Sequence, residues 1–276
     1  MKNPPKVSVI IPCFNHGKYI DEAVDSILQQ TYQEFEIIII DDGSTDPFTI
    51  EKLKSYNKQK TKVIRTKNNG LPAARNKGIQ LATGKYILTL DADDKFHPSF
   101  LEVAVPILDG QSSIGVVTCG LSGFGTKNPA WMPKGGGIKN FLVYNNCLVS
   151  ALFRKKCWSM VKGYNEQMRK GYEDWDFWIS ILEKGWKIYV IRKYLFYYRI
   201  KEESMSREIN KIRPELMKKL VVNHNKTYQR YLDYVISEKE KTILQILNSK
   251  TYRLGNMLLG PVRYLRDFFN SLLTIK

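Results

Sequence analysis

The chain has 276 residues, of which 43% are hydrophobic and 25% are charged, so it is long enough to bury a core and has the composition of an ordinary folded protein. No apolar run reaches the roughly 20 residues that cross a bilayer, and we expect no signal peptide because the run before Pro12 is too short. The four cysteines lack paired spacing and nearby histidine clusters, which predicts reduced thiols, no structural zinc and a cytoplasmic location.

The net charge of +16 is the abnormal bulk property, and it indicates an anionic partner. Residues 1–200 contribute +9 and residues 201–276 contribute +7, so the C-terminal quarter is the denser basic region. A phosphorylated substrate and an anionic membrane surface both fit this charge. A nucleic-acid partner is not expected, because the lysines are spread along the chain and no recognised nucleic-acid motif is present.

The first hundred residues alternate between strand and helix patterns. Short apolar runs predict buried strands, and apolar residues at three- and four-residue steps predict amphipathic helices. This alternation implies an α/β fold with right-handed crossovers and a mixed, mostly parallel sheet flanked by helices. The expected strands are residues 7–11, 35–40, 62–65 and 86–90, and the expected helices are residues 18–30 and 71–82.

The rest of the chain is less regular. Residues 122–140 are rich in Gly, Pro and Lys, which predicts a long mobile loop able to act as a lid. The expected organisation is a domain over residues 1–205 and a basic helical extension over residues 206–276. The expected strands here are residues 148–153, 187–191 and 195–199, and the expected helices are residues 175–183, 209–236, 238–248 and 254–273.

Four polar segments each follow a predicted strand. In open α/β sheets the ligand crevice lies beyond the carboxyl ends of the strands, so these segments are expected to meet in one site. They are residues 15–17, 41–46, 67–70 and 91–94.

The last polar segment reads Asp91-Ala92-Asp93-Asp94. Carboxylates at alternate positions after a strand can bind one hard cation, with the remaining coordination positions filled by substrate phosphate and water, as Mg²⁺ or Mn²⁺ prefers. The alternative is that Asp93 or Asp94 caps the helix that follows. Taken alone, the alternating acids are a weak signal of a metal site.

Two further acidic pairs stand out. Asp41 and Asp42 precede Gly43, and one of them could accept hydrogen bonds from a base or a ribose, although a turn with a helix cap also explains the segment. Glu173 and Asp174 precede an aromatic helix. A carboxylate held there is suited to be a general base, and the alternative is that Asp174 only caps the helix.

Several sequence patterns are absent. The chain has no P-loop, no Gly-rich dinucleotide fingerprint, no nucleophile elbow and no HExxH zinc motif. Hydrolase triads, zinc enzymes and P-loop ATPases are therefore disfavoured.

Five motifs taken together resemble family two of the inverting glycosyltransferases, including those that build bacterial cell-surface polysaccharides. The resemblance covers about residues 5–205 and implies the GT-A fold, with donor binding in about residues 1–110 and the acceptor side in about residues 111–205. The motifs are Val7-Ser8-Val9-Ile10-Ile11-Pro12, Asp41-Asp42-Gly43-Ser44-Thr45-Asp46, Ala74-Arg75-Asn76-Lys77-Gly78, Leu90-Asp91-Ala92-Asp93-Asp94 and Tyr172-Glu173-Asp174-Trp175.

The resemblance implies a nucleotide-sugar donor, expected to be UDP-linked, and a glycan or lipid-linked glycan acceptor. It also implies a role for each matching position. Pro12, Phe14 and Asn15 would border the nucleotide. The base would be contacted by Asp42 with Asp41 beside it, the phosphates would lie near Arg75, and the ribose would lie near Asp91 and Ala92.

The resemblance also implies the chemistry. Asp93 would coordinate Mg²⁺ or Mn²⁺ at the diphosphate, and Asp174, with Glu173 beside it, would deprotonate the acceptor hydroxyl that attacks the anomeric carbon with inversion. The chain departs from the family pattern after Tyr198-Arg199-Ile200, where Lys201 stands in place of a frequent histidine. This leaves a third metal ligand in doubt and offers a lysine that could meet phosphate directly.

The C-terminal residues 254–273 combine apolar residues at helical spacing with flanking arginines. Such a helix could lie on an anionic membrane at the inner face of the cell, near a lipid-linked acceptor. The alternative is a helix docked on the catalytic domain or in a homodimer.

Three other functions remain open from the sequence. A sugar nucleotidyltransferase also begins with a nucleotide-binding α/β half, although Cys13-Phe14-Asn15-His16-Gly17 is a poor version of its glycine-rich loop. A basic nucleic-acid-binding protein is allowed by charge alone. An inactive sugar-binding relative is disfavoured because Asp91, Asp93 and Asp174 are retained.

Overall fold

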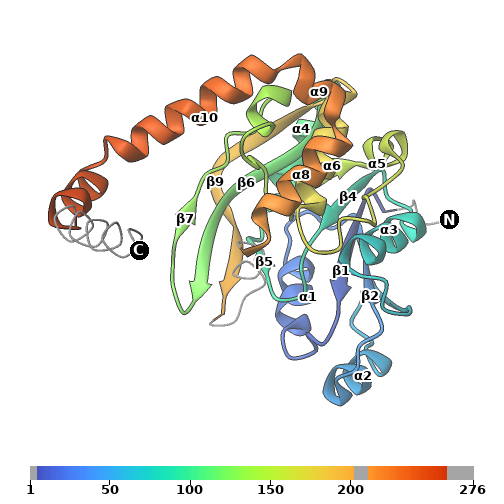
Figure 1. The fold of residues 1–276 in the computed structure, drawn as a ribbon. Helices are drawn as coiled ribbons and strands as arrows, with labels where there is room; N and C mark the ends of the chain where they lie inside the picture. The colour runs from blue at the N-terminus through green and yellow to red at the C-terminus, as the bar shows by residue number, and fades with distance from the viewer. Residues whose placement is uncertain (1–4, 202–210, 260–276) are drawn as a thin grey trace. The chain divides into compact units, whose positions relative to one another are not determined.

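The computed structural model describes residues 5–201 and 211–259. The chain divides into two compact units, Met1–Thr227 and Tyr228–Lys276. The first unit contains a nine-stranded mixed sheet with strand order β3-β2-β1-β4-β8-β6-β9-β5, and β7 pairs with β6 outside that path (Figure 1). The expected α/β fold, a mixed, mostly parallel sheet flanked by helices, is confirmed.

The strands in the N-terminal half of the sheet are parallel. Each strand is a short apolar run, and the helix that follows it brings the chain back to the edge where the next strand starts. Each of these predicted strands forms within two residues of its expected ends. The strands are β1 (Val7–Cys13), β2 (Phe35–Asp41), β3 (Thr61–Arg65) and β4 (Tyr86–Thr89), and the helices are α1 (Ile20–Leu28), α2 (Pro47–Lys54) and α3 (Leu71–Leu81).

The second half of the sheet is mixed. β8 runs antiparallel to β4 and to β6, whereas β6 and β9 are long parallel neighbours. The strands are β5 (Lys95–Phe96), β6 (Ile114–Gly125), β7 (Ala130–Trp131), β8 (Leu152–Arg154) and β9 (Lys187–Ile200); the helices are α4 (Phe100–Gly110), η1 (Ile138–Phe141), α5 (Lys155–Val161) and α6 (Glu173–Glu183).

The loop predicted over residues 122–140 is wrong in its first part. β6 continues to Gly125, and Ser122 pairs with Ala130 of β7. Continuous pairing with β9 up to Gly125 opposite Ile200 overrides the glycine-rich composition. For the same reason the two strands predicted at 187–191 and 195–199 are one strand with register shifts.

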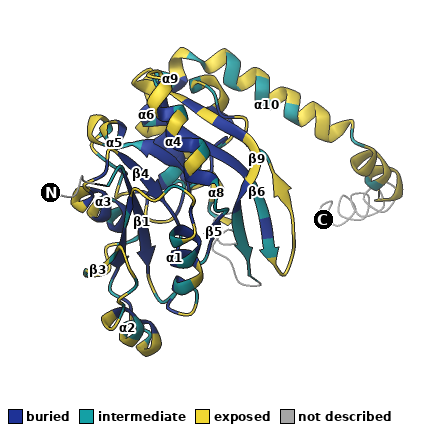
Figure 2. Cartoon of the chain, turned by 180° about the vertical axis from the view of Figure 1, so that it is seen from behind, coloured by how far each residue is buried: buried dark blue, intermediate teal, exposed yellow. Residues whose placement is uncertain are grey.

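The core consists of two apolar clusters, one on each face of the sheet, and Figure 2 shows the sheet as the most deeply buried layer. One cluster includes α1 and α4, and the other includes α3, α5 and α6. A Cβ atom at Gly78 of α3 would lie 2.4 Å from the Ile10 side chain. The close approach of α3 to β1 therefore requires glycine at this position.

The first unit continues past residue 205. Helix α8 (Arg213–Asn223) buries Leu216 and Leu220. The His224 ring lies 3.4 Å from an Asp176 oxygen and 3.1 Å from a Glu183 oxygen, both on α6. Burial lowers the pKa of His224, but hydrogen bonds to the two carboxylates outweigh it and raise the pKa to about 9. The compact unit accordingly ends at Thr227.

The second unit begins within α9 (Asn225–Arg230) and contains α10 (Leu232–Leu247), which has no buried residue. Residues 254–259 are helical, and the remainder of the helix predicted over residues 254–273 lies outside the described residues. In the part of the chain that the structure describes, no helix combines the length and the apolar character needed to cross a membrane.

Candidate functional site

The candidate site lies where β1, β2 and β4 end, as expected for parallel strands that share one direction. Phe14 follows β1 and is 41% exposed, so its ring is free to contact a ligand. Asn15 has a backbone φ of +56°, a conformation that asparagine tolerates. Its side-chain oxygen accepts hydrogen bonds from the backbone N–H groups of Thr45 and Asp46, so Asn15 ties the loop after β1 to the loop after β2.

The two acids after β2 are buried and hold loops in place. Asp42 accepts hydrogen bonds from the backbone N–H groups of Asn69 at 3.0 Å and Gly70 at 2.9 Å, at the start of α3. Asp41 accepts one from Ser44 at 2.8 Å and lies 3.5 Å from the Arg65 guanidinium. These contacts hold the loops after β2 and β3 together, and a contact between Asp42 and a base stays a prediction.

The acidic loop after β4 holds three carboxylates in different environments. The side chains of Asp91 and Asp93 are 27% and 15% exposed, so both reach the surface of the site. Asp94 is buried, and its Oδ1 accepts a hydrogen bond from the backbone N–H of Arg199 in β9 at 2.8 Å. Burial, together with the neighbouring charges of Asp91 and Asp93, holds the pKa of Asp94 well above its usual range.

The alternative that Asp93 or Asp94 caps the following helix is wrong. The N-cap of α4 is Ser99, and no side chain supplies a cap hydrogen bond. Two residues of β5 lie between the acidic loop and that helix. Asp94 instead fastens the acidic loop to β9, because β9 brings the Arg199 backbone alongside it.

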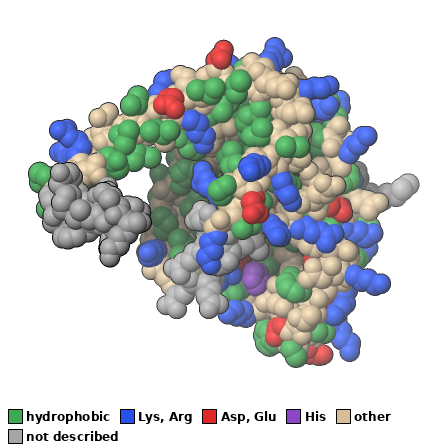
Figure 3. Space-filling model, in the orientation of Figure 1, with side chains coloured by type: hydrophobic (Ala, Val, Ile, Leu, Met, Phe, Trp, Pro, Cys, Tyr) green, Lys and Arg blue, Asp and Glu red, His purple; other side chains and the backbone are tan. Residues whose placement is uncertain are grey.

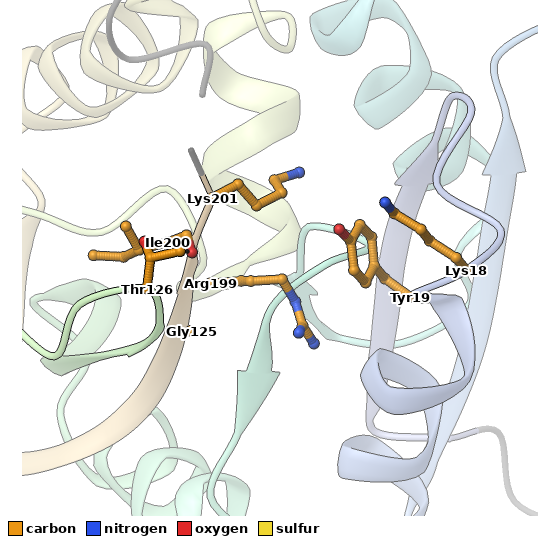
Figure 4. A pocket seen from close by; sticks show the side chains of 7 residues that line it. All are labelled: Lys18, Tyr19, Gly125, Thr126, Arg199, Ile200 and Lys201. Atoms are coloured by element: carbon orange, nitrogen blue, oxygen red, sulfur yellow. Dashed lines mark hydrogen bonds between the residues drawn. The ribbon is translucent and has the colours of Figure 1, made fainter. Parts of the chain in front are cut away.

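A lysine lies directly against the acidic loop. Lys201 Nζ is 2.5 Å from Asp93 Oδ2 and 3.5 Å from His16 Nε2. Burial is the main cause that lowers the pKa of His16, so its ring is neutral near pH 7. Lys201 also lines a pocket of about 520 Å³, with Lys18 opposite it and Tyr19 between them (Figure 4).

Arg75 joins two of the motifs. Its side chain has no exposed surface, and its guanidinium donates to Asp91 Oδ1 at 2.8 Å and to Glu173 Oε1 at 2.7 Å. Helix α3 carries Arg75 underneath the site because this helix packs closely on β1 and β2. The guanidinium thus links the acidic loop to the start of α6, and its approach to phosphate stays a prediction.

Asp174 lies in the first turn of α6. Asn145 Nδ2 donates a hydrogen bond to Asp174 Oδ2 at 2.7 Å. Burial is the largest cause that raises the pKa of Asp174, to about 7, and the charge of Glu173 adds to it, while Arg75 and Asn145 oppose the rise. The alternative that Asp174 caps α6 is wrong, because the N-cap is Tyr172 and no side chain provides a cap bond.

A second pocket of about 420 Å³ includes Asn145, the residue that holds the Asp174 carboxylate. Its lining is aromatic, amide and cationic, and no carboxylate belongs to it. The lining residues are Trp131, Lys134, Tyr144, Asn145, Asn146, Tyr172, Trp175 and Arg213.

Sequence reasoning did not single out Asn145, and it left Lys201 outside the predicted site. Asn145 lies in an irregular segment where no periodicity signals its position, so only the fold brings it to Asp174. In the sequence Lys201 stands out only as a departure from a family pattern, and its contact with Asp93 depends on β9 ending beside the acidic loop.

The profile of glycosyl transferase family 2 matches residues 8–176. The chain is 32% identical to the putative glycosyltransferase EpsE of Bacillus subtilis over 74% of this chain and 76% of that protein. It is 31% identical to the putative teichuronic acid biosynthesis glycosyltransferase TuaG of the same organism over 73% of this chain and 82% of that protein. The chain spans only 18% of the length of two Rickettsia glycosyltransferases that it also matches.

A solved structure, S. aureus TarS 1–349 in complex with UDP-GlcNAc, is similar with a TM-score of 0.64 and 25% sequence identity, covering 79% of this chain and 66% of that one. The similarity agrees with the mixed α/β sheet described above and with the GT-A fold implied by the sequence. The match of the family profile covers more than half of the chain. The chain therefore belongs to glycosyl transferase family 2.

Proposed function

We propose that this chain transfers a sugar from a UDP-linked donor to an acceptor hydroxyl with inversion at the anomeric carbon, as a step in polysaccharide biosynthesis. The observation that carries the proposal is the buried Arg75 guanidinium, which contacts both Asp91 and Glu173. These two ion pairs connect the acidic loop to the start of α6, which carries Asp174 next to Glu173. TarS, which binds UDP-GlcNAc in a similar fold, supports the choice of donor nucleotide.

Asp174 would act as the general base. The acceptor hydroxyl oxygen attacks the anomeric carbon, its proton passes to an Asp174 oxygen, and the bond from the anomeric carbon to the diphosphate oxygen breaks on the opposite face. A carboxylate in bulk water is a weak base at neutral pH, whereas one whose pKa is near 7 accepts a proton readily. Asn145 fixes the orientation of the carboxylate.

The donor would be bound on the side of Arg75 where the acidic loop and the end of β1 lie. The exposed ring of Phe14 offers an apolar surface to the nucleotide, next to the end of β1 at Pro12. Asp91 has one oxygen on Arg75, and its other oxygen is available for a ribose hydroxyl. Lys201 and Lys18 line the adjacent pocket and would attract the diphosphate (Figure 4).

The acidic loop fits a divalent cation that shares its coordination with the diphosphate. Among the described residues, no group of three His, Cys, Asp or Glu side chains forms a complete metal site. Asp93 has its Oδ2 on Lys201 and would offer Oδ1 to Mg²⁺ or Mn²⁺, which commonly take one carboxylate together with phosphate oxygens. When bound, such a cation would neutralise charge on the leaving diphosphate.

The proposal also includes a lipid-linked acceptor, which the chain would reach at an anionic membrane surface. Lys and Arg side chains are spread over the face of the molecule in Figure 3, with few Asp and Glu among them. Helix α10 exposes apolar side chains, including Ile243, Leu244 and Leu247. The test is flotation of the full chain with vesicles that contain about 30% anionic lipid, compared with neutral vesicles. Flotation with neither kind of vesicle contradicts this part.

The catalytic proposal is tested with a panel of UDP- and GDP-linked sugars in the presence of Mn²⁺, by measuring release of the nucleoside diphosphate. We expect hydrolysis of at least one UDP-sugar, and loss of that activity in Asp93→Ala. Turnover of no donor, or an Asp93→Ala variant as active as the parent, would contradict the proposal.

A further inference from the structure

The pocket beside Asn145 has a fixed aromatic surface. Trp131 and Tyr144 both line it and are each 40% exposed, a large exposed fraction for such large rings. Trp175 is held by a hydrogen bond from its indole N–H to the Phe141 carbonyl, and its ring lies 5.0 Å from that of Tyr172. Trp175 itself is 3% exposed, so the exposed rings of Trp131 and Tyr144 are the ones that offer a flat surface for the apolar face of a sugar ring.

Two cations complete the pocket. Lys134 and Arg213 both line it, and neither forms an ion pair with a carboxylate among the residues that the structure describes. By contrast, the cations near the acidic loop are already paired, Lys201 with Asp93 and Arg199 with Glu22. Two uncompensated positive charges beside aromatic rings favour a ligand that carries negative charge.

The position of the pocket connects it to the chemistry. Asn145 lines the pocket and donates its hydrogen bond to Asp174. Tyr172 and Trp175, which flank the Glu173-Asp174 pair in the sequence, line it as well. A sugar stacked on the exposed rings of this pocket would therefore present a hydroxyl close to the Asp174 carboxylate, while a charged substituent reached Lys134 and Arg213.

We propose that this pocket is the acceptor site and that it selects a sugar bearing an anionic group, a carboxylate or a phosphate. This inference rests on the proposed glycosyl transfer, with Asp174 as its base. Arg213 is the stronger determinant, because a guanidinium can bind a carboxylate or phosphate through two parallel hydrogen bonds. A neutral sugar would use the aromatic rings alone.

The test measures binding to the full chain through the fluorescence of Trp131 and Trp175, with UDP at saturation so that the donor site is filled. Three probes of similar size are compared: methyl glucoside, methyl glucuronide and methyl glucoside 6-phosphate. We expect both charged probes to bind about tenfold more tightly than the neutral one at low salt. The better of the two charged probes identifies the source of the charge.

Variants locate the effect. Arg213→Gln and Lys134→Gln should each reduce the preference for the charged probes by roughly three- to tenfold and leave the affinity of the neutral probe unchanged. Lys62→Gln is the matched control, because Lys62 is an exposed lysine on β3 outside the pocket. Trp131→Ala should weaken all three probes alike.

Equal affinity for the three probes, or an Arg213→Gln variant with an unchanged preference, overturns the inference. Hydrolysis of a UDP-sugar without acceptor separates this failure from failure of the proposed function. If hydrolysis occurs and the charged probes are not preferred, only the acceptor assignment falls. If the charged probes are preferred and no donor is hydrolysed, the pocket stands as an anion-selective sugar site and the proposed transfer falls.

Discussion

The acids on the two sides of the candidate site have opposite surroundings. On the donor side, Asp91 and Asp93 each contact a cation, Arg75 at 2.8 Å and Lys201 at 2.5 Å. On the acceptor side, the Asp174 side chain accepts a hydrogen bond from the uncharged amide of Asn145, at 2.7 Å, and the pKa of Asp174 rises to about 7. The same residue type is paired with a cation on one side and made more basic on the other.

This difference teaches how one site can hold a charged donor and also remove a proton. A diphosphate needs positive charge around it, so the donor-side carboxylates must be compensated. A base needs a desolvated carboxylate with no strong cationic partner. Arg75 serves both sides, because it pairs with Asp91 directly, whereas its ion pair on the acceptor side goes to Glu173 and its charge only partly offsets the rise in the pKa of Asp174.

The sharpest way to break the comparison is Asp174→Asn. The amide keeps the shape of the side chain but cannot take the proton, so we expect transfer to fall by about 10²- to 10⁴-fold while the KM for the donor changes little. Released UDP and the transferred sugar are measured separately. Glu51→Gln, at an exposed position on α2, is the control and should behave as the parent. A variant that keeps a tenth of parental transfer would show that Asp174 is not the base.

Arg75→Met removes the cation that both sides share. It leaves Asp91 and Glu173 without their buried partner, which we expect to cost about 3–5 kcal/mol in the free energy of unfolding. The midpoint of urea denaturation measures this loss. Arg75→Lys keeps the charge but cannot span both carboxylates, so its urea midpoint should lie between those of the parent chain and Arg75→Met. Parental stability in Arg75→Met would contradict the role of Arg75 as a buried link.

Asn145→Ala changes only the acceptor side. The hydrogen bond from Asn145 lowers the pKa of Asp174, so its removal should raise that pKa further and move the acid limb of the pH–rate profile to higher pH. Asn140→Ala serves as the control, since Asn140 bonds to the Gly135 carbonyl and not to Asp174. A limb that moves to lower pH would show that Asn145 does not stabilise the ionised carboxylate.

The smallest effect is expected on the donor side. Lys201→Met removes a positive charge next to Asp93, so Mn²⁺ should reach half-maximal activation at a roughly two- to fivefold lower concentration. Lys18→Met, at the opposite side of the same pocket, is the matched control. An unchanged Mn²⁺ requirement in Lys201→Met would mean that the lysine and the cation do not compete for Asp93.

The sequence predicts the N-terminal half of the fold because its strands are uninterrupted apolar runs, such as Val7–Cys13 and Phe35–Asp41. It fails over residues 122–125, where pairing between distant strands decides the structure and local composition suggests a loop. A one-dimensional pattern does not record such pairing.

The same limit applies to the site. The sequence singles out Asp91, Asp93 and Asp174 because each follows a predicted strand or stands next to a predicted helix, and their roles stay predictions. The sequence does not predict the residues that contact these acids, because Asn145 comes to Asp174, and Lys201 to Asp93, only when the chain folds. The difference between the donor-side acids, which are paired with cations, and Asp174, which is bonded to an amide, therefore arises only in the folded chain.

The pH dependence of transfer tests the central claim most directly. Asp174 must be ionised to accept the proton, so with a pKa near 7 the value of kcat/KM should fall tenfold per pH unit below about pH 7 and level off above it. The same limb should be absent from the residual activity of Asp174→Asn. A parental rate that stays constant between pH 5 and pH 9 would contradict the account, because transfer would then not depend on ionising a carboxyl group whose pKa is near 7.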